Sequence, residues 1–139
     1  AAALAEVGLD FGRQVIVLPA CAHPRYLQVN ATCDAMLDTL RWSGGNTSLD
    51  ALACGLPIVT QRGTFMRGRQ SAAMLGLMGL DELIAADADA YVALAARLAG
   101  DTDWRTDLGR RIVAAQPAVF DDAGPLAALE RALVALAEG

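Results

Sequence analysis

A short polar loop with two glycines is the part of this chain best suited to binding a ligand. The loop runs from Ser43 to Thr47, and helix-forming residues follow it from Ser48 to Cys54. The first turn of a helix leaves backbone N–H groups unpaired, and the helix dipole adds partial positive charge there. Because glycines let the backbone approach a bulky anion, this loop would suit a phosphate or diphosphate.

Two interpretations of the loop are equally supported by its residue types. In the first, the polar loop side chains donate hydrogen bonds to a diphosphate, and Asp50, about one turn into the helix, accepts bonds from ribose hydroxyls. In the second, Asn46, Thr47 or Ser48 simply caps the helix. Asp50 would then interact only with the helix dipole. A Gly-Gly-Asn-Thr sequence is not a specific fingerprint, so both interpretations stay open.

Short apolar runs on either side of the loop predict a parallel sheet. Residues 35–39 and 58–60 are expected to be strands that flank the loop and its helix. Two more strands are expected at residues 14–18 and 83–85. The remaining segments favour helices, at residues 1–7, 26–32, 70–79, 87–99, 101–115 and 126–136, with an irregular stretch at 117–125. This alternation predicts an α/β fold with the loop at the carboxyl edge of a parallel sheet.

A second loop, residues 61–69, also follows a strand and should lie at the same edge. Its Arg69 is expected to meet the same anion, although a solvated arginine or one in an ion pair fits the sequence too. Trp42 lies next to the first loop, where it either walls a sugar pocket or packs against the protein. Asp38 ends a strand at this edge, and its simplest role is as a hydrogen-bond acceptor for a loop or helix.

Composition excludes or disfavours several classes of protein and kinds of binding site. The 139 residues suffice for one domain, and the net charge of −5 disfavours nucleic-acid binding. All 11 basic residues are arginines, which excludes a P-loop lysine, and a single histidine disfavours a zinc site. No apolar run is long enough to span a membrane and no secretory signal is evident, so a cytoplasmic protein is expected.

The cysteines and the apolar content lead to two further expectations. Cys21, Cys33 and Cys54 have no CxxC spacing, which favours reduced thiols, with Cys33 and Cys54 as small core residues. The apolar fraction of 55% and the mean hydropathy of +0.36 are high for a soluble chain. An apolar surface that contacts another domain or a second copy of the chain would explain this excess.

Several segments, in one order, resemble the catalytic region of the O-GlcNAc transferase/SPINDLY family of glycosyltransferases, in its bacterial branch. These segments are residues 15–19, 36–39, 44–60, 66–69, 78–85 and 91–95. The resemblance implies a GT-B enzyme, in which two Rossmann-like domains face a cleft and tetratricopeptide repeats usually precede them. Residues 1–139 would be the later part of the second, donor-binding domain, with C-terminal helices from about 101 to 139.

The resemblance also implies roles for individual residues. The backbone of Cys21 would meet the nucleotide base, His23 stands where a base- or phosphate-binding lysine is common, and Tyr26 stands where a histidine lies. The family's His-Thr-Thr corresponds here to Gly45, Asn46 and Thr47, so only Thr47 is retained. The implied donor-binding residues are Cys21, His23, Tyr26, Gly44, Gly45, Asn46, Thr47, Ser48, Asp50 and Arg69.

The leading hypothesis is therefore a domain that binds a nucleotide sugar, UDP-GlcNAc or a similar donor, for a protein O-glycosyltransferase. The family's general base lies in the first domain, so no catalytic residue is expected here and the chain alone should be inactive. No metal or other cofactor is expected. The expected partners are the donor, the missing N-terminal GT-B domain, a protein acceptor and a second copy of the chain.

Two alternatives compete with this hypothesis. One is a non-catalytic interaction or assembly module that keeps the fold but has lost the donor site, as the altered His23, Tyr26, Gly45 and Asn46 would allow. The other is a different GT-B enzyme, such as a nucleotide-sugar epimerase. A dinucleotide oxidoreductase is disfavoured, because no GxGxxG follows a first strand.

Overall fold

Three short parallel strands form the centre of the fold in the computed structural model, which describes residues 2–138. They pair side by side in chain order, and they are β1 (Met36–Leu37), β2 (Ile58–Gln61) and β3 (Ile84–Ala85). The register places Met36 beside Ile58 and Thr60 beside Ile84. The carboxyl ends of all three strands therefore lie at one edge, and the predicted α/β class with a parallel sheet is confirmed.

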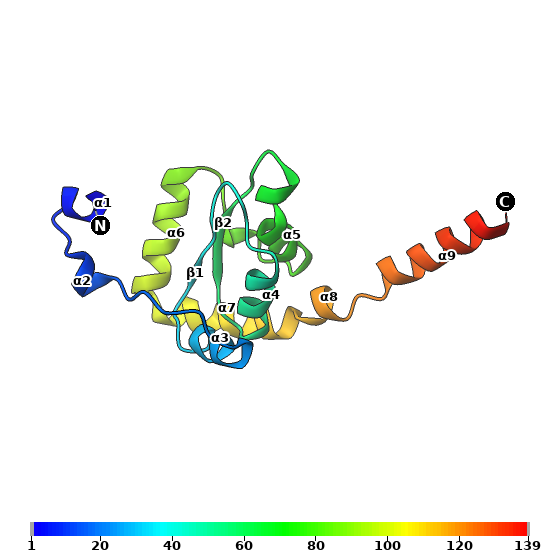
Figure 1. Ribbon diagram of the computed structural model, residues 1–139, viewed down its shortest axis with the longest axis horizontal. Helices are drawn as coiled ribbons and strands as arrows, with labels where there is room; N and C mark the ends of the chain where they lie inside the picture. The colour runs from blue at the N-terminus through cyan, green and yellow to red at the C-terminus, as the bar shows by residue number, and fades with distance from the viewer. Residues whose placement is uncertain (1, 139) are drawn as a thin grey trace.

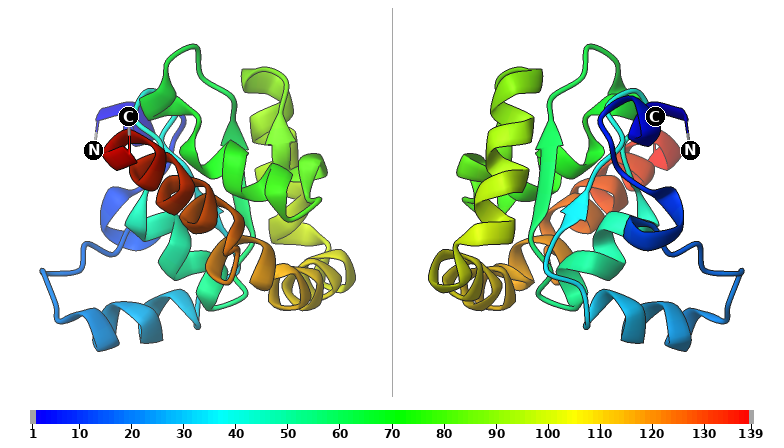
Figure 2. Two further views of the ribbon diagram at one scale, coloured as in Figure 1. Left: turned by 90° about the vertical axis from the view of Figure 1, so that its right-hand side faces the viewer. Right: turned by 90° about the vertical axis from the view of Figure 1, so that its left-hand side faces the viewer.

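Helices cover both faces of this sheet (Figure 1). α4 (Asn46–Ala53) connects β1 to β2, and α5 (Gln70–Leu77) connects β2 to β3. Both connections advance in the same direction across the sheet, so right-handed crossovers put both helices on one face. α6 (Ala88–Gly100) follows β3 and covers the other face (Figure 2). Two short 3-10 turns, η1 (Met66–Gly68) and η2 (Asp81–Leu83), precede α5 and β3.

The remaining helices lie outside this centre. They are α1 (Ala2–Glu6), α2 (Phe11–Gln14), α3 (His23–Asn30), α7 (Thr102–Ala115), α8 (Pro117–Phe120) and α9 (Gly124–Glu138). α3 packs on α4, and α7 packs on α4 and α6. α9 extends away from the body of the fold (Figure 1), and its leucines at positions 126, 129, 133 and 136 are 56% to 79% exposed. None of the helices between residues 2 and 138 combines the length and apolarity needed to cross a bilayer.

Apolar side chains from the strands and the surrounding helices meet in one core. The largest fully buried ones are Leu52, Ile58, Val59, Leu75, Leu80, Leu83, Leu98, Leu108 and Ile112. α6 and α7 begin where the sequence predicted. The Asp87 carboxylate accepts from the Ala90 N–H at 2.8 Å, and the Asp101 carboxylate accepts from the Trp104 N–H at 3.0 Å. These caps satisfy N–H groups that a helix start leaves unpaired.

Three expectations were wrong. Residues 14–18 do not form a strand: Gln14 ends α2, and Ile16, Val17 and Leu18 lie outside any helix or strand with their side chains exposed, Ile16 at 84%. The run has the composition of a buried strand, but no strand among residues 2–138 pairs with it. The stretch expected to be irregular contains α8, which Pro117 starts favourably at its first position. Cys33 is exposed rather than buried, and Cys54 is half-buried.

Candidate functional site

The buried carboxylate of Asp38 organises the loop between β1 and α4. It follows β1 directly and accepts four hydrogen bonds. One oxygen accepts from the backbone N–H groups of Thr39 at 3.0 Å and Gly44 at 2.8 Å. The other accepts from the hydroxyls of Ser43 and Thr60, each at 2.7 Å. Asp38 thus joins the loop to the end of β2, and the expected role of a loop acceptor is confirmed.

Three buried serines extend this network to the start of α5. The Ser43 and Ser71 hydroxyl oxygens lie 2.8 Å apart, as do those of Ser48 and Ser71. Ser43 donates its single hydroxyl proton to the Asp38 carboxylate, which can only accept, so Ser71 donates to Ser43 and Ser48 donates to Ser71. The Ser71 N–H also donates to the Ser43 hydroxyl at 3.0 Å. The network therefore fixes the loop, α4 and α5 relative to one another.

Tyr91 connects α6 to the same place from the opposite face of the sheet. Its hydroxyl donates to the backbone carbonyl of Asp38 at 2.8 Å. Burial, together with the negative charge of Asp38, raises the pKa of the Tyr91 phenol above its ordinary value. The loop is therefore supported from both layers of helices.

The first glycine of the loop is required by its close packing, whereas a side chain at the second would meet only the flexible end of Gln70. A Cβ atom on Gly44 would overlap the Ser48 hydroxyl and lie 2.7 Å from the Thr47 hydroxyl. A Cβ atom on Gly45 would lie 2.7 Å from Oε1 of Gln70. At position 44, only a residue without a side chain lets the backbone follow this path without displacing its neighbours.

α4 begins at this loop without a side-chain cap. Gly45 is its N-cap residue, and no side chain bonds the N–H groups of the first turn. The interpretation in which Asn46, Thr47 or Ser48 caps α4 is therefore wrong. The Ser48 hydroxyl is buried in the serine network and its N–H donates to the Gly45 carbonyl at 3.0 Å. Asn46 and Thr47, by contrast, are exposed at the helix start.

Asp50 and His23, two residues of the predicted donor site, lie in contact. Nε2 of His23, at the start of α3, lies 2.9 Å from Oδ1 of Asp50 on α4. The Asp50 side chain is 21% exposed. The structure thus brings the loop before α3 to the first turns of α4, although the two segments are 27 positions apart.

The second loop lies against the first, as predicted. The Ser43 N–H donates to the Arg67 carbonyl at 2.8 Å. Nε of Arg69 donates to the Gly63 carbonyl at 2.6 Å, which holds this arginine against its own loop. Arg69 forms no ion pair within residues 2–138, so that alternative is not supported.

The remaining predicted residues lie nearby but are not joined to the loop. Cys21 is exposed before α3, and Tyr26 is half-buried on α3. In the described part of the chain, no hydrogen bond links either side chain to the glycine loop. Sequence reasoning missed Thr60, Ser71 and Tyr91, because single hydroxyls in apolar elements carry no distinctive spacing.

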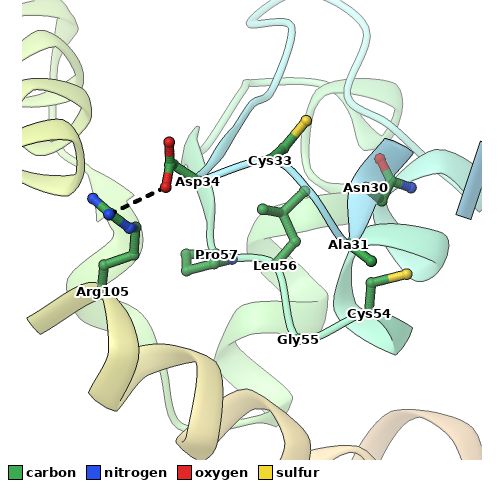
Figure 3. A pocket seen from close by; sticks show the side chains of 9 residues that line it. All are labelled: Asn30, Ala31, Cys33, Asp34, Cys54, Gly55, Leu56, Pro57 and Arg105. Atoms are coloured by element: carbon green, nitrogen blue, oxygen red, sulfur yellow. Dashed lines mark ion pairs between the residues drawn. The ribbon is translucent and has the colours of Figure 1, made fainter. Parts of the chain in front are cut away.

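A separate hollow lies at the opposite, amino ends of the strands, and the charged residues in it have a structural role. It measures about 170 Å³ and contains an ion pair between Arg105 and Asp34 at 3.1 Å (Figure 3). Arg105 also donates to the Leu98 carbonyl at 2.5 Å, near the C-terminus of α6. This arginine therefore ties α7 to the end of α6. No group of three or more metal-ligating side chains occurs in residues 2–138.

Comparisons with known proteins agree with this arrangement. The sequence profile of glycosyl transferase family 41 matches residues 1–121. A SPINDLY protein of Eustoma exaltatum subsp. russellianum, described as a probable UDP-N-acetylglucosamine–peptide N-acetylglucosaminyltransferase, is 30% identical over 105 residues, which are 76% of this chain and 11% of that protein. The UDP-N-acetylglucosamine–peptide N-acetylglucosaminyltransferase of Caenorhabditis elegans is 29% identical over 107 residues, 77% of this chain and 9% of that protein.

A solved structure supports the same assignment. A mutant O-GlcNAc transferase from Thermobaculum terrenum superposes with a TM-score of 0.84 at 31% identity, over 95% of this chain and 26% of that chain. This match confirms the predicted GT-B fold class. The chain spans about a tenth of the length of the curated relatives described above. With the profile covering residues 1–121, the chain belongs to glycosyl transferase family 41.

Proposed function

We propose that this chain binds the nucleotide part of a UDP-linked sugar, UDP-GlcNAc or a close analogue, for transfer to a protein hydroxyl. The observation that carries the proposal is the uncapped start of α4 behind a glycine loop held in place by Asp38. An uncapped helix start offers backbone N–H donors and partial positive charge. Both favour a diphosphate over a neutral ligand.

The roles of the site residues follow from their positions. The side chains of Asn46 and Thr47 are exposed at the helix start and would donate to the diphosphate. Ser48 would act indirectly, because its hydroxyl is buried and shapes the loop. Asp50 would accept from the ribose hydroxyls, and His23 would hold its carboxylate beside the base-binding loop.

The chemistry of this half would be electrostatic. When the bond to the anomeric carbon breaks, negative charge develops on the diphosphate leaving group. Donors already aimed at that charge stabilise the transition state without having to reorganise. The base that activates the acceptor hydroxyl would come from the other domain, so the chain alone is expected to bind the donor without transferring the sugar.

One observation favours the second candidate, a non-catalytic module. The Asp50 carboxylate is already engaged by His23, and the retained loop offers no cationic side chain at Gly45 or Asn46. In that case the fold would serve assembly alone, and no nucleotide would compete with His23 for Asp50.

Isothermal titration of the chain with UDP-GlcNAc, UDP, GDP and ADP tests the proposal. Thr47→Ala and Asp50→Ala should each weaken UDP binding about tenfold or more, because each removes a hydrogen bond to or from a charged group. Thr106→Ala and Asp107→Ala on α7 are matched controls and should leave binding unchanged. Absence of binding by all four ligands, in a chain shown to be folded, would favour the assembly module instead.

A further inference from the structure

Exposed aromatic and basic side chains gather where the loops after β1 and β2 meet. The Arg67 guanidinium carbon lies 4.7 Å from the centre of the Phe65 ring and 5.9 Å from that of Trp42. Trp42 is 69% exposed and Phe65 is 63% exposed, so neither ring is a core residue. The aromatic rings therefore contact the face of the Arg67 guanidinium, an arrangement that a cation and aromatic rings favour.

The two loops enclose a hollow beside this cluster. It measures about 330 Å³ and is lined by Leu40, Arg41, Thr64, Phe65, Arg67 and Gly68. Its shape is fixed by backbone contacts. The Gly63 N–H donates to the Gly68 carbonyl at 2.8 Å, and a Cβ atom on Gly63 would lie 2.8 Å from the same carbonyl oxygen. The hollow is therefore preformed and does not depend on a ligand to shape it.

Charge at this place is opposite in sign to that of the whole chain. The chain carries −5, yet these loops carry four exposed arginines, namely Arg41, Arg62, Arg67 and Arg69. None of the four forms an ion pair within residues 2–138, whereas the four arginines of α6 and α7 all do. Between positions 39 and 80 the single carboxylate is Asp50, and His23 faces it.

Carboxylates at the end of the third strand do not neutralise these arginines. Asp87 follows β3 at the same edge, and its carboxylate accepts from the Ala90 N–H at the start of α6. Asp89 lies in the first turn of α6, and neither aspartate forms an ion pair in the described part of the chain. The arginines therefore remain available to an external anion.

We propose that the hollow between these two loops binds an acidic segment of polypeptide, the glycosyl acceptor. The inference rests on the proposed function in naming that peptide as the acceptor. Trp, Phe, Met and Arg are the residues enriched in protein–protein contacts, and Trp42, Phe65, Met66 and Arg67 supply all four types here. The acidic remainder of the chain would repel an extended nucleic acid, which disfavours that ligand.

Fluorescence anisotropy with labelled peptides tests the inference on this chain. The probe is a nine-residue peptide with a central serine flanked by glutamates, and its control carries glutamine at every glutamate. The acidic peptide should bind about tenfold more tightly than the control, and added salt should reduce the difference. This comparison needs no substitution in the protein.

Charge-matched variants then locate the binding site. Arg41→Gln with Arg67→Gln should weaken binding of the acidic peptide about tenfold and leave UDP binding unchanged. Arg13→Gln with Arg131→Gln removes the same charge from α2 and α9, and should change neither. Equal binding of both peptides, or equal effects of the two double variants, would overturn the inference. Tighter binding of a single-stranded oligonucleotide than of the acidic peptide would overturn it too.

The same samples separate this inference from the proposed function. Peptide binding at the hollow without UDP binding would keep a protein-binding surface but remove its assignment as an acceptor site. UDP binding without preference for the acidic peptide would keep the donor site and reject the acidic acceptor.

Discussion

Removing the Asp38 carboxylate should destabilise the chain strongly, because four donors lose their acceptor at once. In Asp38→Ala the Ser43 hydroxyl can turn to Ser71, but the N–H groups of Thr39 and Gly44 have no such freedom. Leaving a partly buried donor unpaired costs about 1–3 kcal/mol, more when its acceptor was charged. We therefore expect Asp38→Ala to lower the free energy of unfolding by about 3–5 kcal/mol.

Asp38→Asn separates the geometry of the network from its charge. The retained oxygen can still accept from the two backbone N–H groups. The new NH₂ group can donate to the Ser43 and Thr60 hydroxyls, and Ser43 can then donate to Ser71, which lies 2.8 Å away. The network reverses its direction but keeps most of its bonds, so the expected loss is about 1–2 kcal/mol.

Urea unfolding followed by far-UV circular dichroism measures both values. The slope of the free energy against urea should stay constant, since the unfolded state is the same. Asp121→Ala, which removes an exposed carboxylate, should stay within about 0.5 kcal/mol of the parent chain. A loss below about 1 kcal/mol for Asp38→Ala would refute the reasoning, and so would equal losses for the alanine and asparagine variants. If Asp38→Ala does not fold, the asparagine variant still gives a measurable value.

Two other predictions concern the support of the same loop. Gly44→Ala should abolish UDP binding in isothermal titration, because its Cβ atom would overlap the Ser48 hydroxyl; binding as tight as in the parent chain would show that the loop is not the site. Tyr91→Phe should lower the free energy of unfolding by about 1 kcal/mol, through loss of its bond to the Asp38 carbonyl. The raised pKa of Tyr91 adds a pH dependence: its contribution is complete below the unfolded value of about 10 and falls as pH rises further. Urea unfolding of parent and variant at pH 8 and 11 should therefore show a steeper alkaline loss in the parent.

The elements around the loop could be predicted because their signals are local. Short apolar runs predicted β1, β2 and β3. Asp87 or Asp89 predicted the start of α6, and Asp101 predicted the start of α7. The position of both loops at one edge followed from parallel strands alone. Each of these inferences needed only a few neighbouring residues and a known period or capping preference.

The strand predicted at residues 14–18 was wrong because a strand depends on contacts that are not local. A strand exists only when a neighbour supplies its hydrogen bonds, and composition cannot reveal whether that neighbour is present. The side chains of Ile16, Val17 and Leu18 accordingly lie exposed, and so do the leucines of α9. In both places the apolar residues are present, but their side chains stay largely exposed within the described part of the chain.

The residues that hold the loop of the candidate site in shape could not be predicted from the sequence, for another physical reason. Asp38, Ser71 and Tyr91 come from three elements, and they interact only after the sheet has brought those elements together. The residues that would touch a ligand, such as Thr47 and Asp50, sit on one loop and helix and so share a local pattern. A loop with little intrinsic preference for its shape must be held by distant contacts. Its ligand-facing residues can thus be inferred from sequence, while the residues that decide whether it holds its shape require the structure.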